Sequence, residues 1–485
     1  MLFNSVSFLL YFPVVTLFYF LLPHTHQWAL LLAASCLFYM AFIPAYILIL
    51  AFTIVIDYVA AILIANATGT ARKTFLGTSI LSNLGVLFVF KYFNFFNTNL
   101  AAAAEFLGWK YPIHALEIVL PIGLSFHTFQ AMSYTIEVYR GRQQPENHFG
   151  IFALYVMFYP QLVAGPIERP QNLLPQFKEP HNFHPLEASA GLQRMLWGMF
   201  KKVVIADNLA VLVNRVYANP QEHVGFPLLL ATLAFTFQVY CDFSGYSDIA
   251  IGSARVMGFR LRENFDRPYF SPSLGELWRR WHISLSSWFR DYLYIPLGGS
   301  RVSRPRRCLN LCVVFVVCGL WHGANWTYIV WGGLHGLYLA TSVATARLRA
   351  ELIGALGLPT YSASRTASIA HDALCTAVTF GFFAFSLVIF RANSLSDAMF
   401  ILTHMSFSGG ITYAGYWVGW KKALAVGFLA ASLVAVSEVI RKNRPLRDAL
   451  LEQPLFVRWP AYAAAAWLMM NYGATDEIPF IYFQF

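Results

Sequence analysis

Charged residues are scarce in this chain of 485 residues: Asp, Glu, Lys and Arg make up 12% of it, whereas 58% is hydrophobic. A soluble domain carries about 25% charged residues. This shortage excludes an ordinary soluble globular protein and predicts a polytopic membrane protein. The net charge of +10 arises from short basic clusters between apolar runs. That pattern is typical of cytoplasmic loops, and we expect no nucleic-acid partner.

Cysteine is also rare, and several catalytic motifs are missing. The six cysteines form no C-x-x-C pair, so neither a disulfide framework nor a metal site is expected. The sequence lacks G-x-S-x-G, G-x-x-x-x-G-K-[ST] and H-E-x-x-H. Their absence argues against a serine hydrolase, an ATP-driven step within this chain and a zinc protease. The H-x4-D acyltransferase pattern is missing too.

Long apolar runs are abundant, and they predict an all-α membrane protein with about eleven membrane segments of near 20 residues, some short or re-entrant. The runs lie at residues 5–22, 28–43, 45–66, 75–97, 116–139, 226–258, 308–346, 373–390, 421–440 and 458–471, with a short apolar patch near 398–403. Residues 186–218 are more amphipathic and are expected along the membrane surface or at a bundle edge. No separate soluble domain is visible, so residues 1–485 are interpreted as one transmembrane domain.

Basic residues mark the loops that we expect in the cytoplasm. They are Arg72, Arg140, the cluster at 301–307 and the cluster at 441–447. Under the positive-inside rule these positions place the amino terminus outside. The segment around Arg140 is preceded by Pro and Gly residues within an apolar run. Such broken helices are tolerated at membrane depth only when they are buried in protein or line a cavity.

The stretch at residues 315–336 is almost entirely apolar, aromatic or Gly, yet it contains His322 between Trp321 and Gly323. An ionisable group in the bilayer centre costs about 3 kcal/mol, so it is a functional-site hypothesis by default. The alternative is a core histidine that hydrogen-bonds a neighbouring helix. His282 lies 40 residues earlier, and either imidazole is suited to proton transfer near neutral pH.

Other polar residues in apolar surroundings are weaker candidates. His335 and His127 could line the same cavity as His322 or serve the packing alone. Asp242 and Asp248, beside Ser244, should face a polar interior. The residues from 263 to 307 contain a belt of indoles and guanidiniums suited to the membrane interface. Its arginines include Arg279, Arg280 and Arg290.

The chain resembles a known family, the membrane-bound O-acyltransferases. Within it, the chain resembles the bacterial branch that O-acetylates alginate. The strongest matches are Trp278-Arg-Arg-Trp-His282, Trp288-Phe-Arg-Asp291-Tyr, Pro296-Leu-Gly-Gly299 and Leu320-Trp-His322-Gly-Ala-Asn325. Supporting matches include Asp242-Phe-Ser-Gly-Tyr-Ser-Asp248 and the Tyr-Phe-Gln-Phe485 ending. Where related members often have Tyr, this chain has His127.

The resemblance implies a fold and an activity that composition alone does not give. It implies membrane helices in a ring around a thin centre, with funnels from both faces that meet near His322 and His282, the expected catalytic residues. Trp321, Asn325, Asp242, Ser244, Asp248, Arg279, Arg280, Arg290, His127 and His335 are expected to line or brace the site. The implied donor is acetyl-CoA or an acyl-carrier thioester, with no bound cofactor.

The resemblance also implies a bacterial inner membrane location, a polysaccharide acceptor and a periplasmic O-acetyltransferase-like partner. Three alternatives stay open. The acceptor could be peptidoglycan instead of an exopolysaccharide such as alginate. The protein could be a proton-coupled transporter, since intramembrane Asp and His residues serve proton pathways too. It could also be a non-catalytic scaffold of an export complex.

Overall fold

The computed structural model describes residues 1–355, 365–407, 421–440, 450, 452–474 and 478–483, and all regular elements in these ranges are helical. The predicted basic cluster at 441–447 lies outside the described residues. Elsewhere, helices occupy the predicted apolar runs. Prolines separate them at the start of the chain, where Pro23 precedes the second helix and Pro44 begins the turn before the third.

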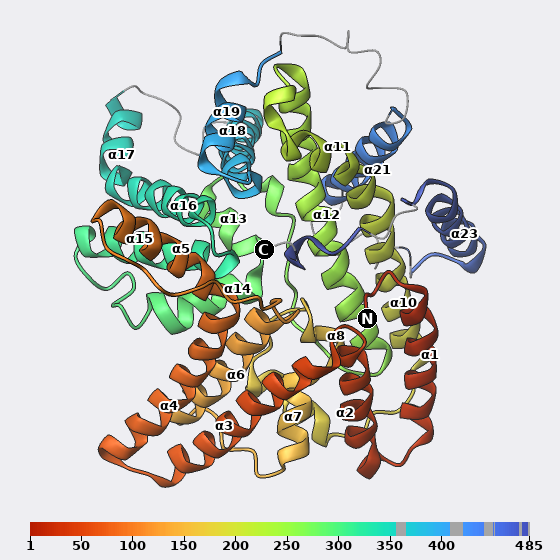
Figure 1. The fold of residues 1–485 in the computed structure, drawn as a ribbon. Coiled ribbons are helices and arrows are strands. Elements are labelled where there is room, and N and C mark those ends of the chain that lie inside the picture. Colours follow the sequence, from red (N-terminus) through yellow and green to blue (C-terminus); the bar gives the residue numbers. More distant parts are fainter. Residues whose placement is uncertain (356–364, 408–420, 441–449, 451, 475–477, 484–485) are drawn as a thin grey trace.

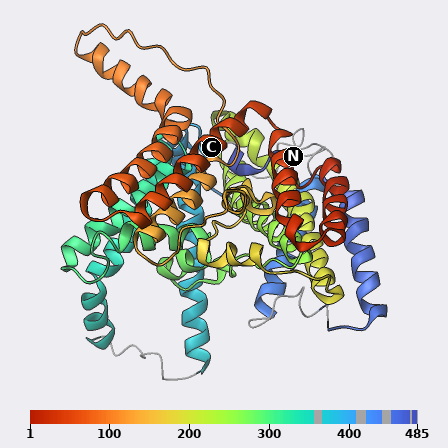
Figure 2. The same cartoon turned by 90° about the horizontal axis from the view of Figure 1, so that it is seen from below.

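The first part of the chain supplies five long helices and a sixth that begins after an irregular stretch. Their bounds are α1 (Val6–Leu21), α2 (His24–Met40), η1 (Pro44–Tyr46), α3 (Ile47–Asn66), α4 (Gly69–Leu87), η2 (Phe88–Tyr92), α5 (Phe93–Phe106) and α6 (Leu124–Tyr139). Helices α4 and α5 are continuous through η2, which is a π-helical turn. The end of α5 extends from one side of the molecule, and the ends of α17 and α18 extend from the opposite side (Figure 2).

The middle of the chain contains a broken segment followed by the longest helix. The elements are α7 (Phe149–Met157), α8 (Tyr159–Leu162), α9 (Pro170–Leu173), η3 (Pro175–Lys178), α10 (Pro185–Phe200), η4 (Lys201–Ala206), α11 (Asp207–Ala218), η5 (Pro220–Glu222) and α12 (Phe226–Val256). The short α8 is fully buried, as expected for irregular backbone at membrane depth. The predicted amphipathic region, 186–218, forms α10, η4 and α11.

The last part of the chain carries the two short helices and the helical hairpin that hold the candidate histidines. The elements are η6 (Pro268–Phe270), α13 (Leu274–Arg280), α14 (Ile283–Phe289), η7 (Arg290–Tyr294), α15 (Arg304–His322), α16 (Trp326–Ala344), α17 (Ala346–Ala355), α18 (Arg365–Arg391), α19 (Leu395–His404), α21 (Lys421–Ile440), α23 (Leu455–Tyr472) and η8 (Ile481–Phe483). Helix α15 and helix α16 form the hairpin.

Four helical stretches of the described residues are long and apolar enough to cross a membrane: Pro44–Asn66, Gly69–Phe106, Phe226–Val256 and Ile369–Arg391. Val6–Leu21 and Leu424–Glu438 are apolar but shorter. Large hydrophobic side chains such as Leu10, Leu48 and Leu81 are exposed on these elements. Apolar side chains that face outward are expected where lipid is the solvent. The all-helical membrane architecture is therefore confirmed, whereas the count of eleven segments stays a prediction.

Glycines allow helix α10 to pack on α12, and α15 on α16, with their backbones in contact. Two pairs of glycines do this between α10 and α12. A Cβ on Gly191 would lie 2.7 Å from the carbonyl oxygen of Gly252, and one on Gly198 would lie 2.5 Å from that of Gly245. Both pairs join α10 to α12. Small residues at a crossing let membrane helices approach closely where no hydrophobic effect drives them together. The α15–α16 hairpin is built in the same way.

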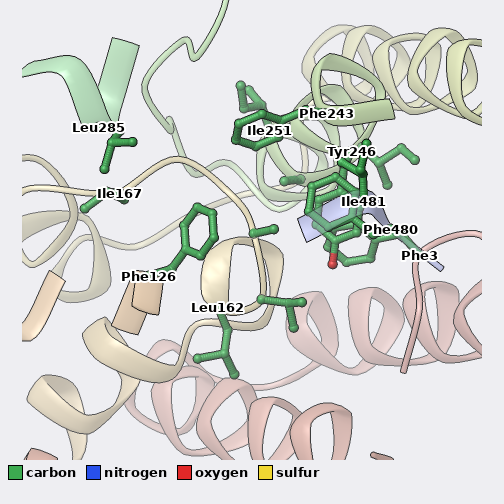
Figure 3. Packing of buried hydrophobic residues seen from close by; sticks show 14 of the residues in the cluster. Phe3, Phe126, Leu162, Ile167, Phe243, Tyr246, Ile251, Leu285, Phe480 and Ile481 are labelled. Carbon is green, nitrogen blue, oxygen red and sulfur yellow. The ribbon is translucent and has the colours of Figure 1, made fainter. Parts of the chain in front are cut away.

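The last described residues lie in the centre of the molecule. In Figure 1 the C-terminal segment, η8, is surrounded by helices. The backbone N–H of Ile481 donates to Oδ2 of Asp242 at 2.9 Å. The ring of Phe480 stacks on Tyr246 with centroids 4.4 Å apart, and Phe3 covers the same tyrosine at 4.5 Å (Figure 3). The core is thus completed by residues from both ends of the described chain.

Three of the predicted cytoplasmic markers lie near one another. The guanidinium of Arg72 donates to the backbone oxygen of Tyr139 at 2.6 Å, and that of Arg140 donates to the backbone oxygen of Asp291 at 3.1 Å. Asp291 belongs to η7, which leads into the basic residues 301–307. The grouping agrees with loops that share one face of the membrane.

Candidate functional site

His322 is the last residue of α15, at the tip of the helical hairpin. The chain leaves the helix in an extended conformation at Gly323 and starts α16 after Asn325. The Asn325 side chain accepts a hydrogen bond from the backbone N–H of Thr327 at 3.0 Å, which is an N-cap. It also donates to the backbone oxygen of Asn393 at 3.2 Å. Asn325 therefore shapes the turn beside His322.

The imidazole of His322 is buried among aromatic rings, with 4% of the residue exposed. Ring centroids of Trp331, Phe390 and Tyr482 lie 5.2, 5.3 and 5.6 Å away. Its Nδ1 has no hydrogen-bond partner among the described residues. Buried polar atoms are normally hydrogen-bonded, and an exception calls for an explanation such as a catalytic role. The unsatisfied nitrogen argues against the alternative of a core histidine bonded to a neighbouring helix.

His282 is held in a strained backbone conformation at the start of α14. Its φ of +44° lies in the left-handed region, which is costly for a residue with a side chain. Asn264 holds the turn: its backbone oxygen accepts from Ile283 N–H at 2.9 Å, and its side-chain oxygen accepts from the Ser284 hydroxyl at 2.9 Å. The His282 residue is 1% exposed, and neither ring nitrogen has a partner among the described residues. Backbone strain of this kind clusters at active sites.

Two aromatic side chains each lie close to both imidazoles. The ring of Trp321 is 5.0 Å from that of His322 and 6.1 Å from that of His282, measured between centroids. Tyr482 is 5.6 Å from His322 and 6.1 Å from His282. The structure thus brings together both histidines and Trp321, as the sequence predicts. In the sequence, Tyr482 stands out only as part of the terminal motif. Nothing local to it predicts a position beside the two imidazoles.

A cavity of about 60 Å³ reaches His322. Its walls combine the last turn of α15 with η2, the start of α6 and the C-terminal segment. The lining residues are Lys91, Leu120, Pro121, Ile122, Gly123, Leu124, Ser125, Phe126, Val163, Trp321, His322 and Tyr482. Gly123 has a φ of +78°, and a Cβ there would lie 2.7 Å from the backbone oxygen of Leu162. Glycine is therefore required where the chain turns into α6 beside the cavity.

A second cavity, of about 230 Å³, lies along the same helix on the side of the basic residues. Leu311, Val314, Phe315 and Cys318 of α15 contribute to its wall, together with Trp278, Arg279, Ser286 and Arg290 from α13, α14 and η7. Cys318 precedes His322 by about one helical turn. The two cavities therefore follow each other along α15. Phe129 stacks on Trp288 at 3.8 Å and on Trp321, which lines the smaller cavity, at 5.4 Å.

The two predicted aspartates on α12 belong to a buried ion-pair network. Asp248 accepts from Arg194 Nε at 2.8 Å and lies 2.7 Å from Lys201 Nζ. Asp242 lies 2.9 Å from Lys202 Nζ and holds the C-terminal segment through Ile481. The predicted Ser244 accepts from Lys201 Nζ at 2.8 Å. None of these α12 side chains lines the two cavities, so their position is that of bracing groups.

The three predicted arginines differ in position. Arg279 and Arg290 line the larger cavity and are exposed, with Arg290 Nε 2.9 Å from Asp291 Oδ1. Arg280 does not line either cavity, and it pairs with Glu276 on the preceding turn of α13. Only the first two are placed to meet a molecule inside the cavity.

The two weaker histidine candidates have packing partners and line neither cavity. Nε2 of His127 lies 2.6 Å from the Thr53 hydroxyl, which joins α6 to α3. Nδ1 of His335 accepts from Trp278 Nε1 at 3.3 Å, and its Nε2 lies 2.9 Å from the Ser386 hydroxyl. His335 is thus bonded through both nitrogens, which is the pattern of a structural histidine.

Sequence reasoning missed two neighbours of the site, Lys91 and Tyr92, which contact the end of α15 from η2. The available signal was a lysine within an apolar run. Among the described residues, no group of three or more His, Cys, Asp or Glu side chains is arranged to hold a metal ion. The His282 imidazole is buried beside Trp321 and lines neither cavity. The site therefore offers the His322 imidazole, a lysine and a tyrosine at a small cavity. An imidazole so placed could accept a proton from a hydroxyl group.

Comparison with known proteins places this geometry in context. A family model described as MBOAT, membrane-bound O-acyltransferase family, matches residues 143–352, which include both candidate histidines. The chain is 35% identical to a probable alginate O-acetylase AlgI of Pseudomonas putida, over 100% of both proteins. It is 43% identical to the probable alginate O-acetylase AlgI of Pseudomonas aeruginosa over 70% of this chain and 65% of that protein. It is 34% identical to a peptidoglycan O-acetyltransferase of Helicobacter pylori over 85% of this chain and 81% of that protein.

Proposed function

Because this chain belongs to the membrane-bound O-acyltransferase family, we propose that it moves acetyl groups from a cytoplasmic donor across the membrane toward hydroxyls of an exported polysaccharide, through an extracytoplasmic partner. The activity is that of a membrane O-acyltransferase. The observation that carries the proposal is His322: a buried imidazole with an unsatisfied nitrogen at the wall of a cavity. The cavity beside the imidazole argues against dry packing around this histidine.

The larger cavity is the proposed donor site. Its walls are mostly apolar, and the guanidiniums of Arg279 and Arg290 lie on it at the end of the molecule that carries the basic loops. Guanidinium groups suit the phosphates of acetyl-CoA or of an acyl-carrier prosthetic group. The apolar wall along α15 would take the chain that carries the thioester, directed towards Cys318 and the turn beyond it.

The smaller cavity is the proposed acceptor side. Helix α15 begins in the basic cluster and rises about 27 Å over the 18 residues from Arg304 to His322. His322 is therefore separated from the basic end by nearly the thickness of a hydrocarbon core, about 30 Å. This distance supports entry of the acceptor from the extracytoplasmic face. The arrangement in which about eleven segments form a ring, with funnels from both faces towards His322, is part of the proposal.

The proposed reaction is a single acyl transfer. An imidazole nitrogen of His322 accepts the proton of the acceptor hydroxyl. At the same time, the hydroxyl oxygen attacks the thioester carbonyl carbon. The tetrahedral intermediate collapses, the C–S bond breaks, and the leaving thiolate takes the proton back from the imidazolium. The products are an acetyl ester and a free thiol. A positioned general base contributes about 10² to 10⁴ in rate. His282 helps to place the donor or shares the proton.

The names of the relatives support the choice of acceptor, whereas the location and the partner are proposed from the family resemblance. Several are named alginate O-acetylases, so an alginate-like exopolysaccharide is the proposed acceptor. The bacterial inner membrane is the proposed location, with an extracytoplasmic O-acetyltransferase-like partner that completes transfer to the polymer. The relative from Helicobacter pylori makes peptidoglycan the second candidate acceptor. Acetyl analysis of purified exopolysaccharide and of purified peptidoglycan from a deletion strain would separate the two candidates.

The direct test replaces His322 with alanine in the full-length chain. His114, an exposed histidine in the segment before α6, serves as the matched control. We expect His322→Ala to reduce polymer acetylation to the level of the deletion strain at unchanged membrane abundance, and His114→Ala to retain it. Acetyl groups per sugar, measured by NMR of the secreted polymer, are the readout. Wild-type acetylation in His322→Ala would end the proposed mechanism and favour a scaffold.

A further inference from the structure

We propose that Lys91 is a positioning residue for His322: its ammonium group fixes the last turn of α15 and with it the imidazole. This inference rests on the proposed function, because it assigns Lys91 to the step in which His322 acts. Lys91 lies on η2, far from His322 in the sequence, and it lines the same cavity. The argument comes from the hydrogen bonds at the end of the helix.

The final carbonyl groups of an α-helix have no partner within the helix. Many helices satisfy them with a left-handed residue after the last turn. Helix α15 does not, because Gly323 is extended, with φ −167° and ψ 154°. Instead, Lys91 Nζ donates to the backbone oxygens of Trp321 at 2.8 Å and His322 at 2.9 Å. The Tyr92 hydroxyl donates to that of Leu320 at 2.9 Å. Three consecutive carbonyls are therefore capped from another element.

The cap depends on a local irregularity of the α4–α5 helix. Residues Phe88–Tyr92 form a π-turn, in which one extra residue is accommodated in the helix. Two adjacent side chains, Lys91 and Tyr92, thereby both reach the end of α15. Such π-turns are rare and occur frequently at functional sites. The described residues contain two further π-turns, η4 and η7, so the role of Lys91 rests on its contacts and not on the π-turn alone.

The electrostatics explain why the capping residue is a cation. The carboxyl end of a helix carries a partial negative charge, so a nearby ammonium group is favourable there. Among the described residues, no ion pair within 4.0 Å involves Lys91. A lysine in an apolar run is expensive and is normally paired. Here the carbonyl oxygens of Trp321 and His322 take the place of a carboxylate.

Lys91 also contacts helix α6, a second element that lines the cavity beside His322. Its Nζ lies 3.5 Å from the hydroxyl of Ser125, at the start of α6, and 5.9 Å from the ring centroid of Trp321. Ser125 and Phe126 line the cavity together with His322. One ammonium group thus contacts both sides of the space in which the hydroxyl must meet the imidazole. A displacement of about 1 Å in such a site can cost about 10² in rate.

The experiment compares Lys91→Met with Lys91→Arg, in the full-length protein in cells that export the polysaccharide. Methionine keeps an apolar side chain of similar length but loses the donors, whereas arginine retains both charge and donors. Lys73→Met is the matched control, since Lys73 is exposed near the start of the same continuous helix, Gly69–Phe106, away from the site. The initial rate of polymer acetylation is measured per molecule in the membrane, together with the melting temperature of each purified protein.

We expect Lys91→Met to lower the rate per molecule by about 10- to 100-fold, Lys91→Arg to retain most of the wild-type rate, and Lys73→Met to match wild type. A wild-type rate in Lys91→Met would overturn the inference. A loss of acetylation that is proportional to the loss of folded protein, and that Lys91→Arg shows as well, would also overturn it. Lys91 would then be needed for folding only. Loss of acetylation in His322→Ala with a normal rate in Lys91→Met would reject the role of Lys91 alone. Full acetylation in His322→Ala would reject the proposed function itself.

Discussion

Replacement of Gly332 by alanine tests whether the hairpin fixes the position of His322. Gly332 lies on α16 where this helix crosses α15. A Cβ added there would lie 2.2 Å from the backbone oxygen of Phe315 and 3.1 Å from the Cα of Gly319. Ordinary contacts of a Cβ begin at 3.4 Å. The nearest atom is backbone, so no side chain can rotate away, and the two helices must separate by about 1 Å to accommodate the methyl group.

The magnitude follows from two opposing effects. Overpacking of a well-packed contact costs about 1–3 kcal/mol. Alanine is better than glycine in a helix by about 1 kcal/mol, which offsets part of this cost. We therefore expect a loss of stability of about 0–2 kcal/mol from these values. The loss of activity should be larger, since a shift of about 1 Å at the site costs about 10² in rate.

Gly333 supplies the control within the same helix. A Cβ at Gly333 would lie 3.8 Å from Val316 Cγ2, an ordinary contact, so Gly333→Ala should keep both stability and activity. The assays are the melting temperature of the purified protein and the rate of polymer acetylation per molecule. Equal acetylation rates for Gly332→Ala and Gly333→Ala would refute the claim that close packing of the hairpin positions His322.

Two further substitutions separate bracing from catalysis. Arg194→Met removes a charge-assisted hydrogen bond to buried Asp248, which keeps its ion pair with Lys201, and should lower stability by about 1.5–3 kcal/mol; an unchanged melting temperature would contradict this. His335→Ala removes the hydrogen bond to Trp278 and should lower stability by about 1–3 kcal/mol. Its acetylation rate per folded molecule should stay at the wild-type level. A stable His335→Ala protein without activity would instead make His335 catalytic.

The helical architecture was predictable because apolar runs and prolines are local signals. The runs at 5–22, 45–66 and 226–258 became α1, α3 and α12 with shifts of a few residues. An acid within an apolar run is expected to have internal partners, and the buried Asp57 on α3 has them, since the Ser79 hydroxyl and the Asn83 amide donate to its carboxylate. What local signals do not contain is the contact between distant segments, and the sequence therefore did not predict the packing of the C-terminal segment in the core.

The site was predicted in part for the same reason. His322 and His282 stand out because an imidazole in an apolar or indole-rich stretch is costly, and the structure brings both to Trp321. The partners of the other candidates depend on tertiary contacts. Nothing local to His335 reveals the bonds to Trp278 and Ser386. Lys91 was visible as a charge in an apolar run, but its acceptors lie about 230 residues away.

The position of Tyr246 between Phe3 and Phe480 has a consequence for biosynthesis. The two outer rings of this sandwich are separated by 477 residues of chain, from 480 − 3. A ribosome that adds about 5–20 residues per second needs roughly 25–95 seconds to connect them. During that interval the nascent protein lacks the Phe480 ring that stacks on Tyr246 and the Tyr482 side chain that lines the smaller cavity. We therefore expect transfer activity to require synthesis of the segment that contains Phe480 and Tyr482.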